Sequence, residues 1–388
     1  MNHLSWKPLV GLFLVIIAIV AVWRLTRRVS PYIPPQNRDL QTTGTLDDAT
    51  AQRLEAILDQ DLNRLKIPGM QATIRTADGK TWSGASGTTD LGRKQALQPD
   101  HILRVGSITK TFTAVIILKL VEDGHLKLDD PLSQWYPDFP NAEKITIRQL
   151  LNHTSGIPEF IPKILMKSII PSTTWQPEEI VKIAAGEKPL FTPGSAFSYS
   201  NANYVLLGLI AEKVTGKTAV ELLHEMIIDP LGLQHTYFIP YEPAPAALVP
   251  GWDRDLSHFP GMLDITVKNT SWATAAFTSG ALASNASDLS TFYENLFAGA
   301  LLSPAVMKEM TTYGEAPNPG FAEQTGYGLG LMQLDIDGRE LVGHVGQFMG
   351  STAIAVVSPQ EKYTIVVVCD LSFPKLTEVV ADLLREIQ

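Results

Sequence analysis

The chain has 388 residues, of which 45% are hydrophobic and 18% are charged, and its formal net charge is −9. The length suits one large two-lobed domain or two ordinary ones, and the composition is that of a globular protein with a hydrophobic core. No block of Lys and Arg occurs after residue 28, which excludes nucleic-acid binding through a basic face. The single cysteine, Cys369, excludes an intramolecular disulfide, and the eight scattered histidines lack the spacing of a zinc site.

Residues 1–28 are predicted to form an N-terminal membrane segment. Within them, 8–23 is an uncharged run that follows Lys7 and precedes Arg24, Arg27 and Arg28. As a helix this run spans about 24 Å, somewhat less than a hydrocarbon core of about 30 Å. No small-residue cleavage site follows, so an uncleaved anchor is favoured over a removed signal peptide. The larger positive charge after the run would, by itself, place the body in the cytoplasm.

Residues 29–45 contain three prolines and no apolar period, which is typical of a linker. The folded body is therefore expected to span residues 46–388. Two candidate strands, 70–76 and 80–86, flank Asp78-Gly79, which is a hairpin turn signature. Before them, one apolar helical face is formed by Leu54, Ile57, Leu58, Leu62 and Leu65.

The end of the chain mirrors its beginning. Segments 330–335 and 339–343 flank Asp337-Gly338 as a second hairpin, and two apolar strands, 351–357 and 363–369, follow. The apolar residues of the last segment, 375–387, fall at helical spacing on one face. Strands joined by such short turns are antiparallel. One antiparallel sheet, flanked by the first and last helices, is therefore predicted from the two ends of the body.

The middle of the body differs, because it combines helical stretches with long proline-rich loops. The predicted fold class is α/β in its α+β form, with a mostly helical lobe inserted into the sheet-containing lobe. The α/β lobe takes about 46–105 and 291–388, and the helical lobe takes about 106–290. The join between two lobes is a natural place for a cleft.

Ser107 and Lys110 open the most apolar helix of the body. Spaced at i and i+3, they lie on one face of its first turn. A serine hydroxyl is a weak nucleophile that needs a base, and a lysine in a buried helix near its positive end has a lowered pKa. The neutral amine of Lys110 could then take the proton of Ser107. The backbone N–H of Ser107 would be available to bind an oxyanion.

Two further segments carry candidate site residues, Tyr199-Ser200-Asn201 and His344-Val345-Gly346. Each of the three segments also has a plainer interpretation. Ser107 and Asn201 would be helix N-caps, and His344 a half-exposed strand histidine. The pattern S-x-x-K recurs at 372–375 and Tyr-x-Asn at 293–295, so neither pattern is specific by itself.

Taken together and in this order, the three segments resemble the signature elements of penicillin-recognising serine hydrolases. The closer likeness is to the class C β-lactamase and serine D-Ala-D-Ala carboxypeptidase family. This resemblance covers about residues 46–388 and implies a β-lactamase/transpeptidase-like fold. Further landmarks of the family match at 150–157 (LLNHTSGI), 193–204, 214–216 and 230–233.

The resemblance also implies roles for individual residues. Ser107 would be the nucleophile, and Lys110 and Tyr199 would share general-base and proton-shuttle duty. His344 would stand where many relatives carry lysine, helping the proton relay and adding charge to the cleft. The expected substrate-binding residues are Asn201, which would bond the acyl-side amide, Gly346, and Gln347, whose N–H would form the oxyanion hole with that of Ser107. The mechanism requires no cofactor and no metal.

The chain departs from the family pattern at Val345. Relatives that bind a substrate carboxylate commonly have Thr or Ser there, and valine has no hydroxyl to donate. A poorly paired carboxylate costs about 1–3 kcal/mol. This favours small-molecule or peptide substrates, as esters or amides, without a free carboxylate beside the scissile bond.

The function expected from the sequence is that of a serine hydrolase working through an acyl-enzyme on Ser107, of D-alanyl-D-alanine carboxypeptidase or esterase/peptidase type. A β-lactamase is the alternative enzyme. A non-catalytic penicillin-binding or sensing module is the alternative of another class. Because the family's substrates are mainly cell-wall peptides and antibiotics, the catalytic domain is expected on the periplasmic or extracellular side, against the charge count around residues 1–28.

Overall fold

The computed structural model describes residues 41–90, 95–168, 173–254, 263–264, 269–317, 321 and 323–387. Its main sheet is built from β1 (Gln41–Gly44), β2 (Gly69–Arg75), β3 (Thr81–Gly87), β9 (Gly314–Glu315), β10 (Gln324–Tyr327), β11 (Met332–Ile336), β12 (Arg339–Phe348), β13 (Ser351–Val357) and β14 (Thr364–Cys369). The spatial order is β1-β3-β2-β14-β13-β12-β11-β10-β9, with every neighbouring pair antiparallel. The two ends of the folded body therefore meet where β2 pairs with β14.

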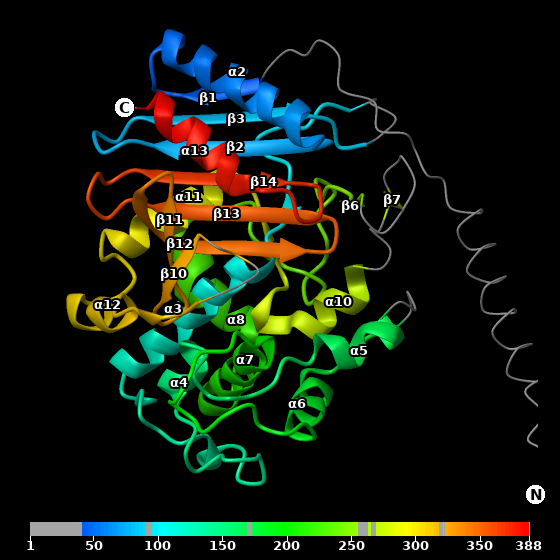
Figure 1. Ribbon diagram of the computed structural model, residues 1–388, viewed down its shortest axis with the longest axis vertical. Helices are drawn as coiled ribbons and strands as arrows, with labels where there is room; N and C mark the ends of the chain where they lie inside the picture. The colour runs from blue at the N-terminus through cyan, green and yellow to red at the C-terminus, as the bar shows by residue number, and fades with distance from the viewer. Residues whose placement is uncertain are drawn as a thin grey trace, which may run out of the picture.

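Helices cover both faces of this sheet. Figure 1 shows α2 (Asp48–Leu65) and α13 (Leu376–Glu386) in front of it and α11 (Ala286–Phe297) behind it. On β14, Ile365 and Val367 pack in the cluster of α2 and α13, whereas the alternate residues pack in the cluster of α11. All six residues of β14 are buried, which is why the strand is apolar from Ile365 to Cys369.

The inserted part of the chain is mostly helical and lies below the sheet in Figure 1. Its helices are α3 (Thr109–Glu122), α4 (Ile147–Leu151), α5 (Ile161–Ser168), α6 (Pro177–Ala185), α7 (Asn201–Thr215), α8 (Ala219–Leu223), α9 (Asp229–Leu231) and α10 (Asn269–Ala276), with the π-helical turn η3 (His224–Ile228) and the 3₁₀ turns η1 (Gly106–Ile108), η2 (Leu132–Gln134) and η6 (Phe277–Ser279). Short pairings join β4 (Leu103–Arg104), β8 (Leu282–Ser284) and β5 (Tyr237–Phe238), and also β6 (Trp252–Asp253) and β7 (Leu263–Asp264), while α12 (Pro304–Met310) precedes β9.

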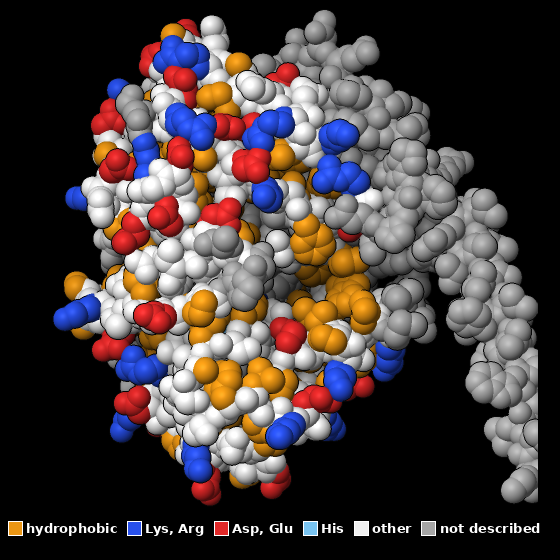
Figure 2. Space-filling view, in the orientation of Figure 1, with side chains coloured by type: hydrophobic (Ala, Val, Ile, Leu, Met, Phe, Trp, Pro, Cys, Tyr) orange, Lys and Arg blue, Asp and Glu red, His pale blue; other side chains and the backbone are white. Residues whose placement is uncertain are grey.

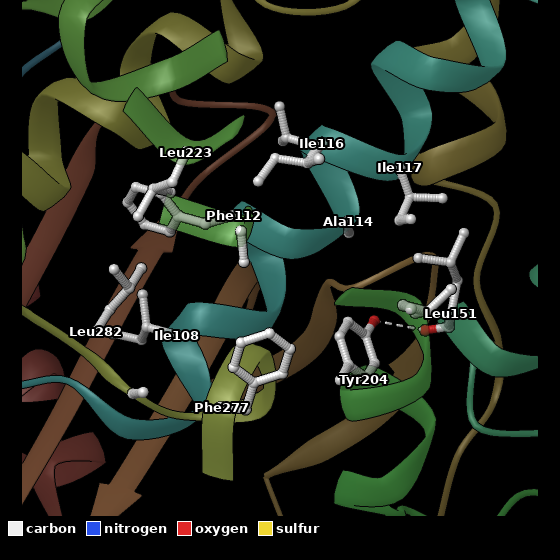
Figure 3. Close-up of a cluster of buried hydrophobic side chains, with 14 of the residues drawn as sticks. Ile108, Phe112, Ala114, Ile116, Ile117, Leu151, Tyr204, Leu223, Phe277 and Leu282 are labelled. Carbon is white, nitrogen blue, oxygen red and sulfur yellow. Dashed lines mark hydrogen bonds between the residues drawn. The ribbon is translucent and has the colours of Figure 1, made fainter. Parts of the chain in front are cut away.

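Helix α3 is the centre of this part. Its residues from Thr109 to Leu118 are all buried, because α7, α8 and η6 surround it. Figure 3 shows apolar side chains of α3 among those of neighbouring elements, and it shows the hydroxyl of Tyr204 bonded to the carbonyl of Leu151 at 2.7 Å. A helix enclosed in this way is apolar on all sides. It gives the residues of its first turn a rigid support.

The predicted fold class, an antiparallel sheet flanked by terminal helices with a helical insertion, is confirmed. Two boundaries differ from the prediction. Residues 41–44, assigned to the linker, form β1 and pair with β3, because an extended segment can satisfy its backbone groups along an open sheet edge. Helix α11 begins inside the segment assigned to the helical lobe, but it packs on β14 and β2.

Within the described ranges, no helix combines the length and the apolar character needed to cross a bilayer. The predicted membrane segment, residues 1–28, lies outside the described residues. The same is true of residues 29–40 of the predicted linker.

Candidate active site

Ser107 lies in η1, immediately before α3, and two glycines let this turn pack directly against β12. A Cβ atom on Gly346 would stand 1.8 Å from the carbonyl oxygen of Val105, and one on Gly106 would stand 2.5 Å from that of Gln347. Gly106 also has a φ of +51°, which disfavours other residues. The structure therefore gives Gly346 a packing role, which is to bring the strand and the serine turn together.

The second half of β12, which lies near Ser107, extends past the residues that pair with β11. That pairing ends where Met332 lies opposite Gly343, while β13 pairs with β12 as far as Phe348. The segment from His344 to Phe348 thus has β13 on one edge and packs near η1 on the other. An extended substrate could add to such an edge.

Lys110 is fully buried, and its Nζ atom lies 3.0 Å from Ser107 Oγ. The same nitrogen donates to Asn201 Oδ1 and to the carbonyl oxygen of Ser279, both at 2.7 Å. Burial lowers the pKa of Lys110 from its ordinary value of 10.5 to about 7, although the negative charge of Glu159 opposes part of this decrease. A large fraction of the amine is therefore neutral near pH 7, and the neutral form is a base for the Ser107 hydroxyl.

The ring of Tyr199 lies beside Lys110, with its centroid 4.8 Å from Nζ. Burial raises the pKa of Tyr199 well above its ordinary value, and the Ser107 hydroxyl opposes this rise. Among the described residues, no neighbour makes a hydrogen bond of good geometry with the buried phenolic oxygen. The ring of His153 packs against that of Tyr199 at a centroid distance of 4.2 Å and holds it in place.

Asn201 is held at both ends of its side chain. Its Oδ1 atom accepts from Lys110, and its Nδ2 atom donates to Glu159 Oε2 at 2.8 Å. The backbone N–H of Asn201 also donates to that carboxylate oxygen, at 2.9 Å. Asn201 lines the same cavity as Ser107, and its hydrogen-bond partners are Lys110 and Glu159.

His344 is placed differently from the expectation. It is fully buried, its Nδ1 atom lies 2.7 Å from the carbonyl oxygen of Val345, and its Nε2 atom lies 2.9 Å from the hydroxyl of Tyr327. A carbonyl only accepts, so Nδ1 carries the proton and Nε2 accepts from Tyr327. Burial, with the nearby charge of Lys110, lowers the pKa of His344 to about 3. The expectation that His344 adds positive charge to the cleft is therefore wrong, because desolvation keeps the ring neutral.

Ser107, Tyr199, Asn201 and Gln347 line one cavity of about 360 Å³. No charged side chain of the described residues lines it. The apolar part of its lining consists of Phe160, Ile161, Leu165, Trp272, Ala275, Ala276, Phe348, Met349 and Phe373. Figure 2 shows hydrophobic side chains gathered on this face, over the region of α5, α10 and the ends of β12 to β14. Leu165 and Phe373 are 46% and 50% exposed, as expected at the mouth of an apolar site.

A second cavity of about 540 Å³ adjoins the first, and Gln347 and Phe373 line both. Val345 faces this second cavity, which is more polar and is also lined by Glu323 and Lys375. The missing hydroxyl at Val345 therefore affects the second cavity, not the apolar cavity that Ser107 lines.

Several residues of the site were missed by the sequence analysis. Glu159, His153 and Tyr327 all contact predicted site residues. His153 and Glu159 lie in or directly after the segment 150–157, so that landmark was the available signal. Nothing local marked Tyr327, because strand pairing alone brings it to His344.

Among the described residues, no group of three or more His, Cys, Asp or Glu side chains is placed to hold a metal ion. Cys369 is buried on β14, and burial raises the pKa of its thiol, so it packs as a core residue.

Comparison with known proteins agrees with this geometry. The Beta-lactamase family model matches residues 54–388. Protein flp of Staphylococcus aureus is 33% identical over 199 residues, which are 50% of this chain and 39% of that protein. Esterase EstB of Burkholderia gladioli is 29% identical over 217 residues, which are 52% of this chain and 55% of the esterase. The chain therefore matches about half, or less, of the length of these two relatives.

A solved structure covers more of the fold. The D-amino acid amidase from Ochrobactrum anthropi SV3, complexed with L-phenylalanine amide, has a TM-score of 0.81 and 28% identity to this chain. The match covers 88% of this chain and 99% of the amidase. With the family model matching most of the sequence, the chain belongs to the Beta-lactamase family of serine hydrolases.

Proposed function

We propose that this protein hydrolyses esters or amides through a covalent acyl-enzyme on Ser107. The observation that carries the proposal is the 3.0 Å contact between Ser107 Oγ and a fully buried Lys110 Nζ whose pKa is about 7. A nucleophile within hydrogen-bonding distance of a base with a lowered pKa is the arrangement that acyl transfer requires. The assembly of Ser107, Lys110 and Tyr199 at one cavity argues against a non-catalytic binding module.

The reaction would proceed in two steps. Neutral Lys110 takes the hydroxyl proton as Ser107 Oγ attacks the substrate carbonyl carbon, and the backbone N–H groups of Ser107 and Gln347 bind the oxyanion. The bond to the leaving group then breaks, and the leaving group receives a proton through Tyr199. In the second step water attacks the acyl-enzyme, with its proton taken by the same groups, and the acid product leaves Ser107 free.

The substrate proposed is uncharged and apolar next to the scissile bond. The cavity at Ser107 has a mainly apolar lining, and Val345 has no hydroxyl for a carboxylate in the adjoining space. Two of the proteins named above are an esterase and a D-amino acid amidase, and their names support the two reactions proposed here, hydrolysis of esters and of amides. D-alanyl-D-alanine carboxypeptidase activity, which requires a free carboxylate, is the less favoured form of the same mechanism.

A matched peptide pair tests the substrate class. We expect N-acetyl-D-Ala-D-Ala amide to be cleaved with a kcat/KM at least ~10-fold higher than that of N-acetyl-D-Ala-D-Ala, because the free carboxylate would be poorly paired. Equal or reversed preference, measured by product release, would contradict this expectation and support a carboxypeptidase. Intact mass after mixing with benzylpenicillin separates the remaining alternatives. A lasting adduct indicates penicillin recognition, and rapid loss of the drug without an adduct indicates a β-lactamase.

We also propose that residues 1–28 anchor the protein, with the catalytic domain on the periplasmic or extracellular side. The support is the uncharged run 8–23 and the extracytoplasmic substrates of the resembled family. We expect the full chain to stay in the membrane pellet after carbonate extraction, and added protease to digest the body in intact spheroplasts. Digestion only after lysis would indicate the opposite orientation, with the catalytic domain in the cytoplasm. Release of the full chain by carbonate would remove the anchor from the proposal.

A further inference from the structure

Glu159 holds a central place in the polar network of the site. Its Oε2 atom accepts from the backbone N–H and the side-chain Nδ2 of Asn201, at 2.9 and 2.8 Å. Its Oε1 atom accepts from the backbone N–H groups of Phe160 and Ile161, at 2.8 and 3.1 Å. Four N–H donors thus surround one side chain, and a carboxylate is the group that accepts from all of them.

This arrangement determines how the amide of Asn201 is turned. A carboxylate cannot donate, so the Nδ2 end of Asn201 must face Glu159 and the Oδ1 end must face Lys110. If the amide turned over, its oxygen would face the carboxylate and its N–H₂ group would face Lys110 Nζ. Both new contacts would be unfavourable while Glu159 is ionised and Lys110 is charged.

The orientation matters most when Lys110 is neutral. A neutral amine has two N–H bonds and one lone pair, and three polar partners surround Nζ. Asn201 Oδ1 and the Ser279 carbonyl can only accept, so they take the two N–H bonds. The lone pair is then directed at the remaining partner, the Ser107 hydroxyl. With Asn201 turned over, its N–H₂ group would donate to this lone pair and compete with Ser107.

We propose that Glu159 is a positioning residue that fixes the amide of Asn201 and so reserves the lone pair of Lys110 for Ser107. The proposal rests on the proposed function, in which Lys110 is the base. Glu159 does not itself line the cavity, and it acts on Lys110 through Asn201, which does.

The charge of Glu159 provides a second, separable effect. The other titratable groups around Lys110 are Tyr199, Tyr204, His153 and His344. Burial raises the pKa of both tyrosines and lowers that of both histidines, which keeps all four neutral near pH 7. Glu159 is the described group whose negative charge raises the pKa of Lys110. Its removal should therefore move the acid limb of the pH–rate profile to lower pH.

The test is a double-mutant cycle in the full chain, with p-nitrophenyl butyrate as substrate. In Glu159→Gln, the new amide can donate to a turned-over Asn201, so we expect kcat to fall ~10–100-fold with little change in KM. In Glu159→Gln/Asn201→Asp, the carboxylate at position 201 accepts from both Lys110 and the new amide at position 159. Because its two oxygens are equivalent, this holds for either orientation of the carboxylate. We expect this double variant to recover at least ~5-fold of the lost kcat, with an acid limb at higher pH than in Glu159→Gln.

The rescue separates positioning from simple support of α5. Asn201→Asp does not replace the bonds that Glu159 accepts from the backbone N–H groups of Phe160 and Ile161, so it would not rescue damage to α5. Such damage would instead raise KM, because Phe160 and Ile161 line the cavity. Glu143→Gln, which replaces an exposed glutamate, is the matched control and should stay within ~2-fold of wild type.

Two outcomes would overturn the inference. One is a Glu159→Gln variant with wild-type kcat, and the other is a double variant no faster than the product of the two single effects. If instead wild type and Ser107→Ala hydrolyse the ester equally, the proposed function itself fails and the inference falls with it. A wild-type rate that depends on Ser107, together with an unchanged Glu159→Gln, leaves the function standing and removes only the role of Glu159.

Discussion

Ser107→Ala is expected to lower kcat/KM for p-nitrophenyl butyrate by ~10⁴-fold or more, to near the rate without enzyme. The reason is that alanine removes the proposed nucleophile, the Oγ atom, while the neighbours of Ser107 keep their positions. Lys110 retains its bonds to Asn201 and to the Ser279 carbonyl. The fold should therefore persist, and the loss should appear in kcat rather than in the urea midpoint of unfolding.

The chain contains a matched control for this substitution. Ser372 begins the second S-x-x-K pattern, but its Oγ atom accepts from the backbone N–H of Gly350 at 2.7 Å. Ser372→Ala should cost about 1–3 kcal/mol of stability by leaving that N–H unsatisfied. Its kcat/KM should stay within a few-fold of wild type. Comparable loss of activity in both variants would show that the assay reports folding and not the nucleophile.

Lys110→Met is expected to lower kcat/KM by ~10³-fold. Methionine has a similar length and is easily buried, but it offers no base to Ser107. Wild-type activity should rise with pH through about 7, because the neutral amine is the active form and the pKa of Lys110 is about 7. The residual activity of Lys110→Met should lack this acid limb. An intact limb near pH 7 in the variant would assign the titration to another group.

The same substitution should separate stability from activity. The pKa of Lys110 is 10.5 when unperturbed and about 7 in the folded protein, so between these values the unfolded chain binds more protons. Stability contributed by this site therefore rises with pH from about 7 to 10.5 and is lowest below 7. Lys110→Met removes that dependence, and its urea midpoint at pH 7 should be no lower than that of wild type. Lys119→Met, on the same helix but partly exposed, should leave both activity and the pH profile near wild type.

Local sequence was enough to predict the frame of the fold. The turns at Asp78-Gly79 and Asp337-Gly338 connect β2 with β3 and β11 with β12 as expected. Such hairpins depend on a few adjacent residues, and amphipathic helices depend on a short period. The pairing of Ser107 with Lys110 was equally local, since one helical turn places them on the same side. Neighbouring residues along the chain carry all of these signals.

The rest was decided by contacts between distant segments. His344 is neutral because burial between paired strands, near the charge of Lys110, lowers its pKa, and no feature of the segment 344–346 indicates this. Glu159 reaches Asn201 only because α5 and α7 begin side by side. The sequence by itself determined the family, the fold class and the serine–lysine pair. Only the tertiary structure decided which side chains are charged and how they are oriented, because desolvation and hydrogen-bond direction depend on neighbours far away in the chain.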